Sequence, residues 1–233
     1  KIFKLIIWFL HLMNKNVTTL VAFDLDGALI DSAKDFHNCL NLLTKKHNEE
    51  EIEYTEVRER VSEGSFSLIK HAFKGSSEKR TNLLREELLD LYEENCLLKT
   101  IKFEGADSLI QYLESEKIKW CIVTNKPRRF AEKIVKHFFP SLDHKKMLFC
   151  PDEFIEPKPS PRGLNLACKN TNSDPSSSFF VGDHAIDIEA GRRAGIHTIA
   201  VDYGYRKIDD LVENWNANFT VSNLCEIKNL IHE

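Results

Sequence analysis

Acidic, hydroxyl and basic side chains follow the apolar runs of this chain in an order that suits one kind of chemistry. In chain order they are Asp24, Asp26, Thr124, Asn125, Lys158, Asp183 and Asp187. Most of them directly follow runs typical of buried strands, and parallel strands of an α/β sheet bring their carboxyl ends to one crevice. Two carboxylates, a hydroxyl, a cation and a metal-binding pair can therefore meet there. Such a set suits phosphoryl transfer through an aspartyl-phosphate.

Asp24 and Asp26 are two residues apart in an extended segment, so both carboxylates point to the same side. One of them can attack a phosphorus atom as a nucleophile. The other can protonate the leaving oxygen and then deprotonate the attacking water. Gly27 permits a tight turn after the strand. The same residues also fit an ordinary Asp-Gly turn with a helix-capping Asp, so the pair alone does not decide the function.

The hydroxyl of Thr124 and the backbone N–H groups around Asn125 follow a second strand-like run, where they can bind phosphate oxygens. Lys158 lies in a proline-rich loop, whose stiffness reduces the entropy lost in aiming one side chain. An ammonium group held there can bind phosphate and offset two carboxylates. A strand-end turn and a solvated surface lysine are the plain structural alternatives.

Asp183 follows a third apolar run, and Asp187 lies four residues later, on the adjacent turn of the helix expected there. Carboxylate oxygens, with waters and a substrate phosphate, suit Mg²⁺ better than Zn²⁺. The alternative is that Asp183 caps the helix and Asp187 stabilises its first turn, and both explanations can hold together. Each motif has such an alternative singly, but the four motifs in this order favour an enzyme.

Apolar runs alternate with amphipathic segments through most of the chain, which predicts an α/β fold with a doubly wound, Rossmann-like parallel sheet. The expected strands are residues 19–25, 120–124, 147–150, 178–181, 197–201 and 219–221. Residues 33–99 are the exception, with helical spacing alone at residues 35–46, 55–63, 66–73 and 78–98. In the last helix Leu83, Leu84 and Leu88 predict the buried face, and Arg85 falls on the other face.

This pattern predicts a core domain of residues 13–32 and 100–233, with residues 33–99 inserted after the first strand as an all-helical domain. Residues 1–12 are strongly apolar but shorter than the about 20 residues of a membrane-spanning helix. They are also not followed by the small-residue cleavage site of a signal peptide. We expect Met13 to be the true start and residues 1–12 to be an upstream or disordered segment, which intact-mass analysis of the native protein checks.

The bulk composition is ordinary for a soluble globular protein, with 42% hydrophobic and 29% charged residues. The formal net charge of -4 gives no reason to expect nucleic acid or an anionic membrane as a partner. The six cysteines are scattered without metal-binding spacing, which predicts buried thiols in a reducing cytoplasm. We therefore expect a cytoplasmic protein whose partner is a small phosphorylated metabolite. No pattern in the sequence indicates an oligomeric state.

The motifs resemble those of the haloacid dehalogenase superfamily of phosphohydrolases. The matched segments, from the first motif to the fourth, are residues 23–32 (FDLDGALIDS), 123–127 (VTNKP), 158–159 (KP) and 181–187 (VGDHAID). Residues 33–99 stand where that family carries its C1-type helical cap. Within the family, residues 150–152 (CPD) and 203–205 (YGY) are similar to phosphoglycolate phosphatases and to their sister enzymes acting on N-acetylmuramate 6-phosphate.

The resemblance implies a role for each matched position. It implies that Asp24 is the nucleophile and a Mg²⁺ ligand. It implies that Asp26 is the general acid and base, and that its backbone carbonyl also reaches the metal. The other implied roles are phosphate binding by Thr124, Asn125 and Lys158, metal ligation by Asp183, and support of the metal site from close by for Asp187.

The resemblance also points to contacts from the cap. Residues 61–64 (VSEG) are similar to the segment that dips over the site in this branch. Glu63, Gly64 and Ser65 are therefore candidate contacts with the substrate. Arg129, just after the second motif, is a candidate contact with either the substrate or the cap.

The first motif departs from the family at Ala28, where a Thr is usual. A hydroxyl there would brace the loop, so we expect Ala28 to reduce activity at worst. The favoured function is a Mg²⁺-dependent phosphatase for a small phosphomonoester. A phosphomutase of the same fold and a non-catalytic binding protein on the same scaffold stay open as alternatives. A dehalogenase is disfavoured, because attack on carbon needs no proton donor such as Asp26.

Overall fold

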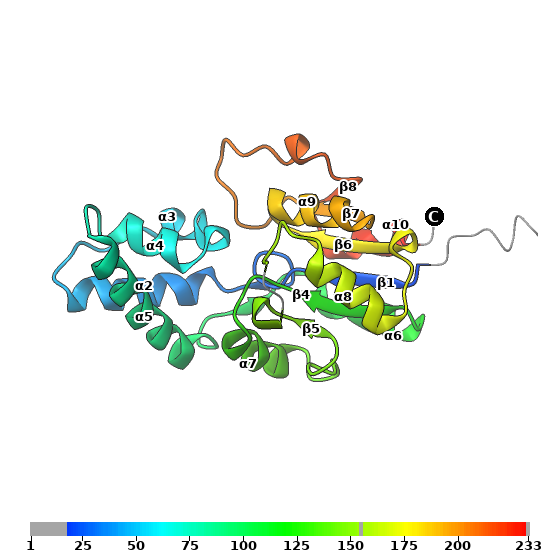
Figure 1. Cartoon of the computed structure of the whole chain (residues 1–233), viewed down its shortest axis with the longest axis horizontal. Coiled ribbons are helices and arrows are strands. Elements are labelled where there is room, and N and C mark those ends of the chain that lie inside the picture. The colour runs from blue at the N-terminus through cyan, green and yellow to red at the C-terminus, as the bar shows by residue number, and fades with distance from the viewer. Residues whose placement is uncertain (1–17, 154–155, 232–233) are drawn as a thin grey trace, which may run out of the picture.

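The sheet at the centre of the molecule has six parallel strands in the order β5-β4-β1-β6-β7-β8 (Figure 1). The computed structural model describes residues 18–153 and 156–231. The strands are β1 (Leu20–Phe23), β4 (Lys119–Val123), β5 (Leu148–Phe149), β6 (Ser178–Gly182), β7 (His197–Val201) and β8 (Phe219–Val221). The chain runs outward from β1 through β4 and β5, then crosses to β6 on the other side. The predicted doubly wound α/β class is confirmed.

Alternate residues of the strands pack against helices on opposite faces of the sheet. Leu20 and Ala22 of β1 belong to the apolar cluster that includes residues of α8 and α9. Val21 and Phe23 belong to the cluster that includes residues of α6 and α7. All four side chains are fully buried, as expected for a strand covered on both faces. The flanking helices are α6 (Ala106–Ser115), α7 (Arg128–Phe138), α8 (Arg162–Thr171), α9 (Ala185–Ala194) and α10 (Ile227–Leu230).

A group of helices lies beside the sheet, and we call it the helical lobe (residues 33–99; Figure 1). Its helices are α2 (Ala33–Lys46), α3 (Tyr54–Arg58), α4 (Ser65–Ala72) and α5 (Glu78–Asn95). The prediction of helices alone in this segment is confirmed. The helix expected over residues 55–63 is instead divided into α3 and the 3-10 turn η1 (Val61–Glu63). This division buries Val61 and turns the hydroxyl of Ser62 toward the sheet residue Asp183.

Two short antiparallel strands, β2 (Ile30–Asp31) and β3 (Ile101–Lys102), form a neck where the chain enters and leaves the helical lobe. Beside the neck, the buried carboxylate of Asp35 accepts hydrogen bonds of 2.9 Å from the N–H groups of Lys99 and Thr100. The hydroxyl of Thr100 donates another, at 2.7 Å. These contacts tie the first helix of the lobe to the returning chain. The sequence did not predict β2 and β3, because two-residue strands carry no periodic pattern.

Helix α5 buries a face that differs from the predicted one. Leu84 and Leu88 are buried as expected, but Leu83 is 59% exposed and Leu89 is buried in its place. The prediction for Leu83 is therefore wrong. Arg85, placed on the outer face by the helical pattern, instead lines a cavity between the lobe and the sheet. An amphipathic pattern predicts a single buried face for a helix. Helix α5 contacts both the lobe and the core, so the surface that it buries differs from that face.

An aromatic cluster joins the helical lobe to the core. The ring of Tyr92 on α5 stacks on Phe36 of α2, with ring centroids 3.9 Å apart. The same ring meets Phe130 of α7 edge-on, with centroids 5.5 Å apart. Tyr92 and Phe130 are nearly fully buried, so the lobe and the core share one continuous apolar cluster.

Several sequence predictions concern features other than the sheet. Five of the six cysteines are buried and free, as expected, and Cys225 is exposed. Within the two described ranges, no helix is both long enough and apolar enough to cross a bilayer. Residues 1–12 and the suggested start at Met13 lie outside the described residues.

Candidate active site

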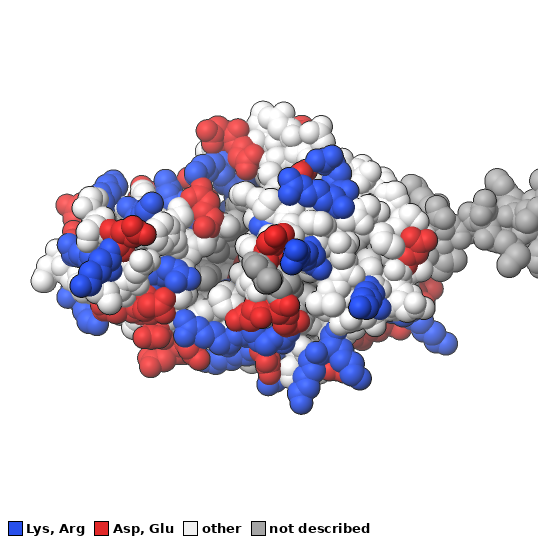
Figure 2. Space-filling view, in the orientation of Figure 1, with Lys and Arg blue, Asp and Glu red and all other residues white. Residues whose placement is uncertain are grey.

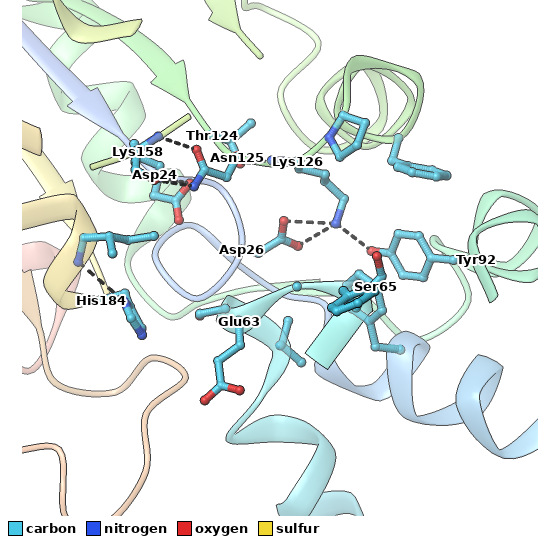
Figure 3. A pocket seen from close by; sticks show the side chains of 18 of the residues that line it. Asp24, Asp26, Glu63, Ser65, Tyr92, Thr124, Asn125, Lys126, Lys158 and His184 are labelled. Atoms are coloured by element: carbon cyan, nitrogen blue, oxygen red, sulfur yellow. Dashed lines mark hydrogen bonds and ion pairs between the residues drawn. The ribbon is translucent and has the colours of Figure 1, made fainter. Parts of the chain in front are cut away.

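A cavity of about 290 Å³ lies between the carboxyl ends of the central strands and the helical lobe (Figure 3). The turn after β1 supplies Asp24 and Asp26. The turn after β4 supplies Thr124, and the loop before α8 supplies Lys158. The predicted site residues that line the cavity are Asp24, Asp26, Glu63, Gly64, Ser65, Thr124, Asn125, Lys158 and Asp187. The structure thus brings together groups that are widely separated in the sequence.

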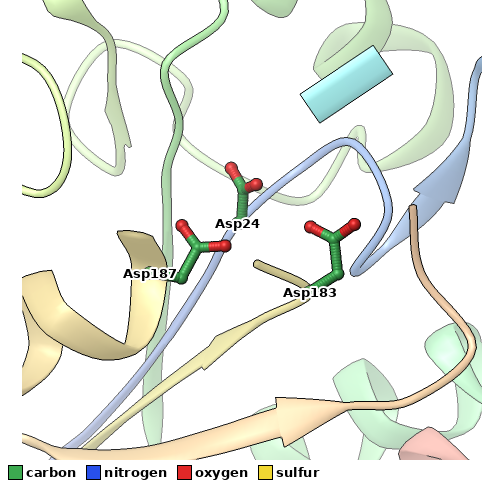
Figure 4. Close-up of side chains that lie close together, drawn as sticks. All are labelled: Asp24, Asp183 and Asp187. Atoms are coloured by element: carbon green, nitrogen blue, oxygen red, sulfur yellow. The ribbon is translucent and has the colours of Figure 1, made fainter. Parts of the chain in front are cut away.

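Asp24, Asp183 and Asp187 form an acidic cluster, with one carboxylate oxygen from each lying within 4.8 Å of the others (Figure 4). In each residue Oδ1 is buried and has no hydrogen-bond partner of good geometry among the described residues. Lys158 Nζ forms ion pairs with two of these atoms, at 2.8 Å from Asp24 and 2.6 Å from Asp187. Buried oxygen donors without a full set of partners fit a divalent metal ion.

Burial and mutual repulsion make the acidic cluster hard to ionise without a counter-charge. Burial raises the pKa of Asp24 to about 6, against the opposing effect of the Lys158 charge. Burial, followed by the charges of Asp187 and Asp24, raises the pKa of Asp183 well above its ordinary value. For Lys158, burial lowers the pKa, but the two paired carboxylates outweigh it and raise the pKa above its ordinary value. A bound cation would favour the ionised carboxylates.

The carboxylate of Asp183 is wedged between backbone turns. Its Oδ2 accepts a 2.7 Å hydrogen bond from the N–H of Tyr205 and a 3.4 Å hydrogen bond from the hydroxyl of Ser62 on the lobe. A Cβ added at Gly27 would lie 1.9 Å from Asp183 Oδ2, and one at Gly204 would lie 2.2 Å from Asp183 Cβ. Gly27 also has a φ of 88°, a conformation that favours glycine. Both glycines therefore make room for this carboxylate.

Asp187 belongs both to the acidic cluster and to the start of α9. Its Oδ2 accepts a 3.1 Å hydrogen bond from the N–H of His184, as part of a capping box. The N-cap residue is His184, so the alternative in which Asp183 caps the helix is wrong. Asp187 does stabilise the first turn of the helix, and it contacts Lys158 at the same time. The first-turn role of Asp187 is thus confirmed, and its support of a metal site stays a prediction.

Asn125 positions the loop that carries Lys158. Its side-chain carbonyl accepts a 2.9 Å hydrogen bond from the N–H of Lys158, and its amide donates a 3.2 Å hydrogen bond to the carbonyl of Lys158. The side-chain amide of Asn125 is therefore engaged with the loop, and phosphate binding at this position stays a prediction. Thr124 Oγ1 accepts a 3.1 Å hydrogen bond from the N–H of Lys126, which leaves the hydroxyl proton of Thr124 available to an acceptor in the cavity.

Lys126 is a site residue that the sequence patterns did not identify. Its Nζ donates hydrogen bonds of 2.9 Å to both carboxylate oxygens of Asp26 and to the hydroxyl of Tyr92 on α5 (Figure 3). The hydroxyl of Ser32 donates another to Asp26. Asp26 is thus oriented by both the core and the helical lobe. The position of Lys126 two residues after Thr124, inside the second motif, was the sequence feature that could have identified it.

The turn of residues 24–30 is held by backbone contacts although it contains Ala28. The N–H of Gly27 donates to the carbonyl of Ile30 at 2.9 Å. The hydroxyl of Tyr203 donates to the carbonyl of Ala28 at 2.8 Å, and the Ala28 side chain is fully buried. These contacts brace the turn where a hydroxyl is missing. The expected effect of Ala28 on activity stays a prediction.

The lobe side of the cavity includes η1, the start of α4 and residues of α5. The carboxylate of Glu63 points away from Asp26 and pairs with Lys207 at 2.6 Å (Figure 3). Burial raises the pKa of Glu63, but hydrogen bonds from Lys207 and Ser67 outweigh it and leave the pKa below its ordinary value. The hydroxyl of Ser65 accepts a 3.0 Å hydrogen bond from Arg85 Nε. Glu63 and Ser65 lie where the sequence predicted them, each with a partner.

Arg129 lies outside the set of residues that line the cavity. Its guanidinium forms an ion pair with Glu93 of α5 at 3.5 Å and lies 4.4 Å from the centroid of the Phe130 ring. Arg129 was predicted to contact either the substrate or the cap, and the structure shows a contact with the helical lobe.

On the face of the molecule that Figure 2 displays, the described residues form no large patch of a single charge sign. There, acidic and basic side chains of the described residues intermix over both the lobe and the core. By contrast, Lys126 and Lys158 are buried at the cavity. Positive charge for an anionic ligand is therefore concentrated locally in a protein with a net charge of -4.

Comparison with known proteins extends these observations. Residues 21–201 match the family described as haloacid dehalogenase-like hydrolase. The chain is 37% identical over 212 residues to the N-acetylmuramic acid 6-phosphate phosphatase of Pseudomonas putida, covering 91% of this chain and 95% of the relative. It is 33% identical over 204 residues to the phosphoglycolate phosphatase of Xanthomonas campestris pv. campestris, covering 86% and 90%.

Solved structures share the fold. The crystal structure of a predicted phosphoglycolate phosphatase from Haemophilus somnus superposes with a TM-score of 0.83 at 22% identity, covering 93% of this chain and 99% of that one. The family match spans most of the sheet and the helical lobe, and the two relatives match over nearly their whole length. The chain belongs to the haloacid dehalogenase-like hydrolase family.

Proposed function

We propose that this protein is a phosphatase that hydrolyses a small phosphomonoester through an aspartyl-phosphate intermediate. The observation that carries the proposal is the pair of carboxylates on one turn, each with its own lysine. Asp24 contacts Lys158 at 2.8 Å, and Asp26 contacts Lys126 at 2.9 Å. Two carboxylates in different environments suit two different roles in one reaction.

Asp24 is the proposed nucleophile. One of its carboxylate oxygens forms a bond to phosphorus while the bond from phosphorus to the ester oxygen of the substrate breaks. Asp26 gives a proton to that leaving oxygen and later takes a proton from the water that attacks the aspartyl-phosphate, so that inorganic phosphate leaves. The hydroxyl of Thr124 and the ammonium group of Lys158 hold the phosphate oxygens in both steps.

The acidic cluster is the proposed site of Mg²⁺. Asp24 and Asp183 would ligate the ion, with the backbone carbonyl of Asp26 as a further donor and Asp187 in support. A divalent ion there reduces the repulsion between an anionic nucleophile and an anionic phosphate. The buried Oδ1 atoms that lack a hydrogen-bond partner of good geometry, and the raised pKa values of Asp24 and Asp183, support this assignment.

The helical lobe (residues 33–99) is the proposed C1-type cap on a core of residues 13–32 and 100–233. Its neck of β2 and β3 is a suitable place for a small rotation, since the chain passes between the two parts at these two short strands. Closure over the cavity excludes water during attack, and reopening allows hydrolysis and release. A location in the cytoplasm belongs to the same proposal, and the buried free thiols fit a reducing compartment.

The proposed substrate is a small phosphorylated carboxylic acid. The relatives described above are named for N-acetylmuramic acid 6-phosphate and for phosphoglycolate, and the former is the more similar of the two. N-acetylmuramic acid 6-phosphate is therefore the first candidate and phosphoglycolate the second. Both are phosphate esters that also carry a carboxylate.

The test is phosphate release from both candidates, with and without Mg²⁺, by the wild-type protein and by Asp24→Asn. We expect release that requires Mg²⁺ and Asp24. Asp107→Asn on α6 is a control, because it removes an exposed carboxylate that does not line the cavity. No release from any phosphomonoester by folded protein contradicts the proposal. Transfer of the phosphoryl group to a second hydroxyl would indicate a phosphomutase, and binding without turnover a binding protein.

A further inference from the structure

Arg85 brings a positive charge from the helical lobe to the cavity. It lies on α5 and lines the cavity together with Ser65 and Phe66. Its Nε donates to the hydroxyl of Ser65 at 3.0 Å, and its Nη1 donates to Glu86 at 3.0 Å. Nη2 makes no hydrogen bond with the described residues. The guanidinium therefore retains N–H donors for a ligand.

The two lysines of the cavity are committed to carboxylates that are buried or half-buried. Lys158 pairs with the acidic cluster and Lys126 with Asp26, and their side chains are only 3% and 5% exposed. The side chain of Arg85 is 35% exposed, and that of its partner Glu86 is 61% exposed. An ion pair so open to water is weak. Arg85 can accordingly exchange this partner for an anionic group of a ligand.

The position of Arg85 indicates which part of a ligand it would meet. The groups proposed to hold the phosphate lie on the sheet side of the cavity, whereas Arg85 and Ser65 belong to the lobe side. A ligand whose phosphate lies at Asp24 extends toward the lobe. Glu63 in the same wall does not oppose an anion there, because its carboxylate is paired with Lys207 at 2.6 Å (Figure 3).

We propose that Arg85, oriented by Ser65, binds the carboxylate of the substrate and makes the enzyme selective for phosphate esters of carboxylic acids. The inference rests on the phosphatase function proposed above and names the residue that recognises its substrate class. A guanidinium presents its N–H donors as a planar fork that matches the two oxygens of a carboxylate. A hydroxyl beside the guanidinium, such as that of Ser65, limits the directions in which the fork can point.

Matched substrate pairs test this inference in the full-length protein. N-acetylglucosamine 6-phosphate lacks the lactyl carboxylate of N-acetylmuramic acid 6-phosphate, and ethyl phosphate lacks the carboxylate of phosphoglycolate. We expect Arg85→Gln to lower kcat/KM by about 10- to 100-fold for the acids, the range for a hydrogen bond to a charged group. For the partners without a carboxylate we expect a change of less than about 3-fold, because they never make that bond.

Two further variants separate charge from geometry and from general effects on α5. Arg85→Lys keeps the charge but loses the fork, so its kcat/KM for the acids should lie between those of the wild type and Arg85→Gln. Arg80→Gln is the matched control, because Arg80 lies on the same helix, is exposed, and pairs with Glu49 away from the cavity. Arg80→Gln should leave kcat/KM unchanged for both substrates of each matched pair.

Binding measurements separate this inference from the proposed hydrolysis. The affinities of the same four compounds are measured by calorimetry in Asp24→Asn and in the double variant Asp24→Asn/Arg85→Gln. A preference for the acids that disappears with Arg85 supports the inference even if the wild type releases no phosphate. An equal loss of affinity for the acids and for the partners without a carboxylate, or no preference that depends on Arg85, overturns it.

Discussion

The sheet side and the lobe side of the cavity differ in how their charged groups are held. On the sheet side, Asp24, Asp183 and Lys158 are buried and contact one another or the backbone through several short bonds. On the lobe side, Glu63 and Arg85 are partly exposed, and each pairs with an exposed partner. The first arrangement is interlocked, and the second can change partners.

This difference suggests that the two sides of the cavity have different functions. Charges interact strongly in a buried site because the dielectric constant is low, and they also cost much free energy when a partner is lost. Exposed charges interact weakly and tolerate change. Chemistry that is common to many substrates suits the sheet side, and discrimination among substrates suits the lobe side. Variants on the two sides should therefore differ in the size and kind of their effects.

The largest effect is expected for Lys158→Met. This change removes a cation from between Asp24 and Asp187 and, with it, the proposed donor to the phosphate, so phosphate release should fall by about 10²- to 10³-fold. Steady-state kinetics with saturating Mg²⁺ measures it. Lys169→Met is the control, because Lys169 is an exposed lysine on the adjacent helix α8. A loss of only a few fold would show that the sheet side is no more demanding than the lobe side.

Mg²⁺ should stabilise the fold, and more so as the pH rises. The raised pKa values of Asp24, about 6, and Asp183 mean that the folded protein holds these protons more tightly than the unfolded chain. The metal-free protein therefore loses stability as the pH rises from about 4 through 6. Mg²⁺ is proposed to bind the deprotonated cluster, and it should then add about 2.7 kcal/mol at a hundredfold excess over its Kd.

Thermal melts at pH 5 and pH 7.5, with Mg²⁺ or with a chelator, measure this effect. Asp183→Asn serves as the comparison, since it removes one buried charge and one ligand while keeping the shape of the side chain. In that variant the Mg²⁺-dependent shift in Tm should shrink at pH 7.5. An equal shift in Asp183→Asn and the wild type would contradict the assignment of the metal to the acidic cluster.

Lys126→Met should have a smaller effect that depends on the leaving group. Asp26 is the proposed proton donor to the leaving oxygen, and this change removes the ammonium contact that positions it, so we expect kcat to fall by about 10- to 100-fold for a sugar phosphate. For p-nitrophenyl phosphate, whose leaving group departs without a proton, the loss should be several-fold smaller. Equal losses for both substrates would mean that Lys126 acts on structure alone.

The smallest effect is expected at the ion pair between Glu63 and Lys207. Both side chains are partly exposed, and such pairs contribute at most about 1 kcal/mol. Lys207→Ala should therefore raise KM by less than about 5-fold and leave kcat unchanged. The double variant Glu63→Gln/Lys207→Ala should behave like either single variant if the two residues act only through each other. A large fall in kcat would instead place this pair with the interlocked groups of the sheet side.

The sheet side was predictable because its residues follow strands. Asp24, Thr124 and Asp183 each come directly after an apolar run, and the corresponding strands β1, β4 and β6 are neighbours in the sheet. Parallel strands place such residues at one edge, so their order along the chain was enough to predict their meeting. The helices of the lobe could also be predicted, from the helical spacing of their apolar residues.

The network around Asp26 was not predictable in the same way. It combines Lys126 from the core with Tyr92 from the helical lobe, and their contact depends on how the two parts pack. No spacing within one segment records that packing. The same reason explains Arg129, which contacts Glu93 of the lobe and does not line the cavity.

The sequence by itself determined the α/β class, the helical insertion and the identity of the acidic groups, because strand and helix periodicities and strand-end residues are local properties. The tertiary structure alone decided which way α5 faces, and with it the placement of Arg85 at the cavity and Leu83 in solvent. A helix packed against two neighbours buries a surface set by both of them. Its own residues specify the amphipathic pattern, but the direction of each side chain follows from the contacts that the whole fold creates.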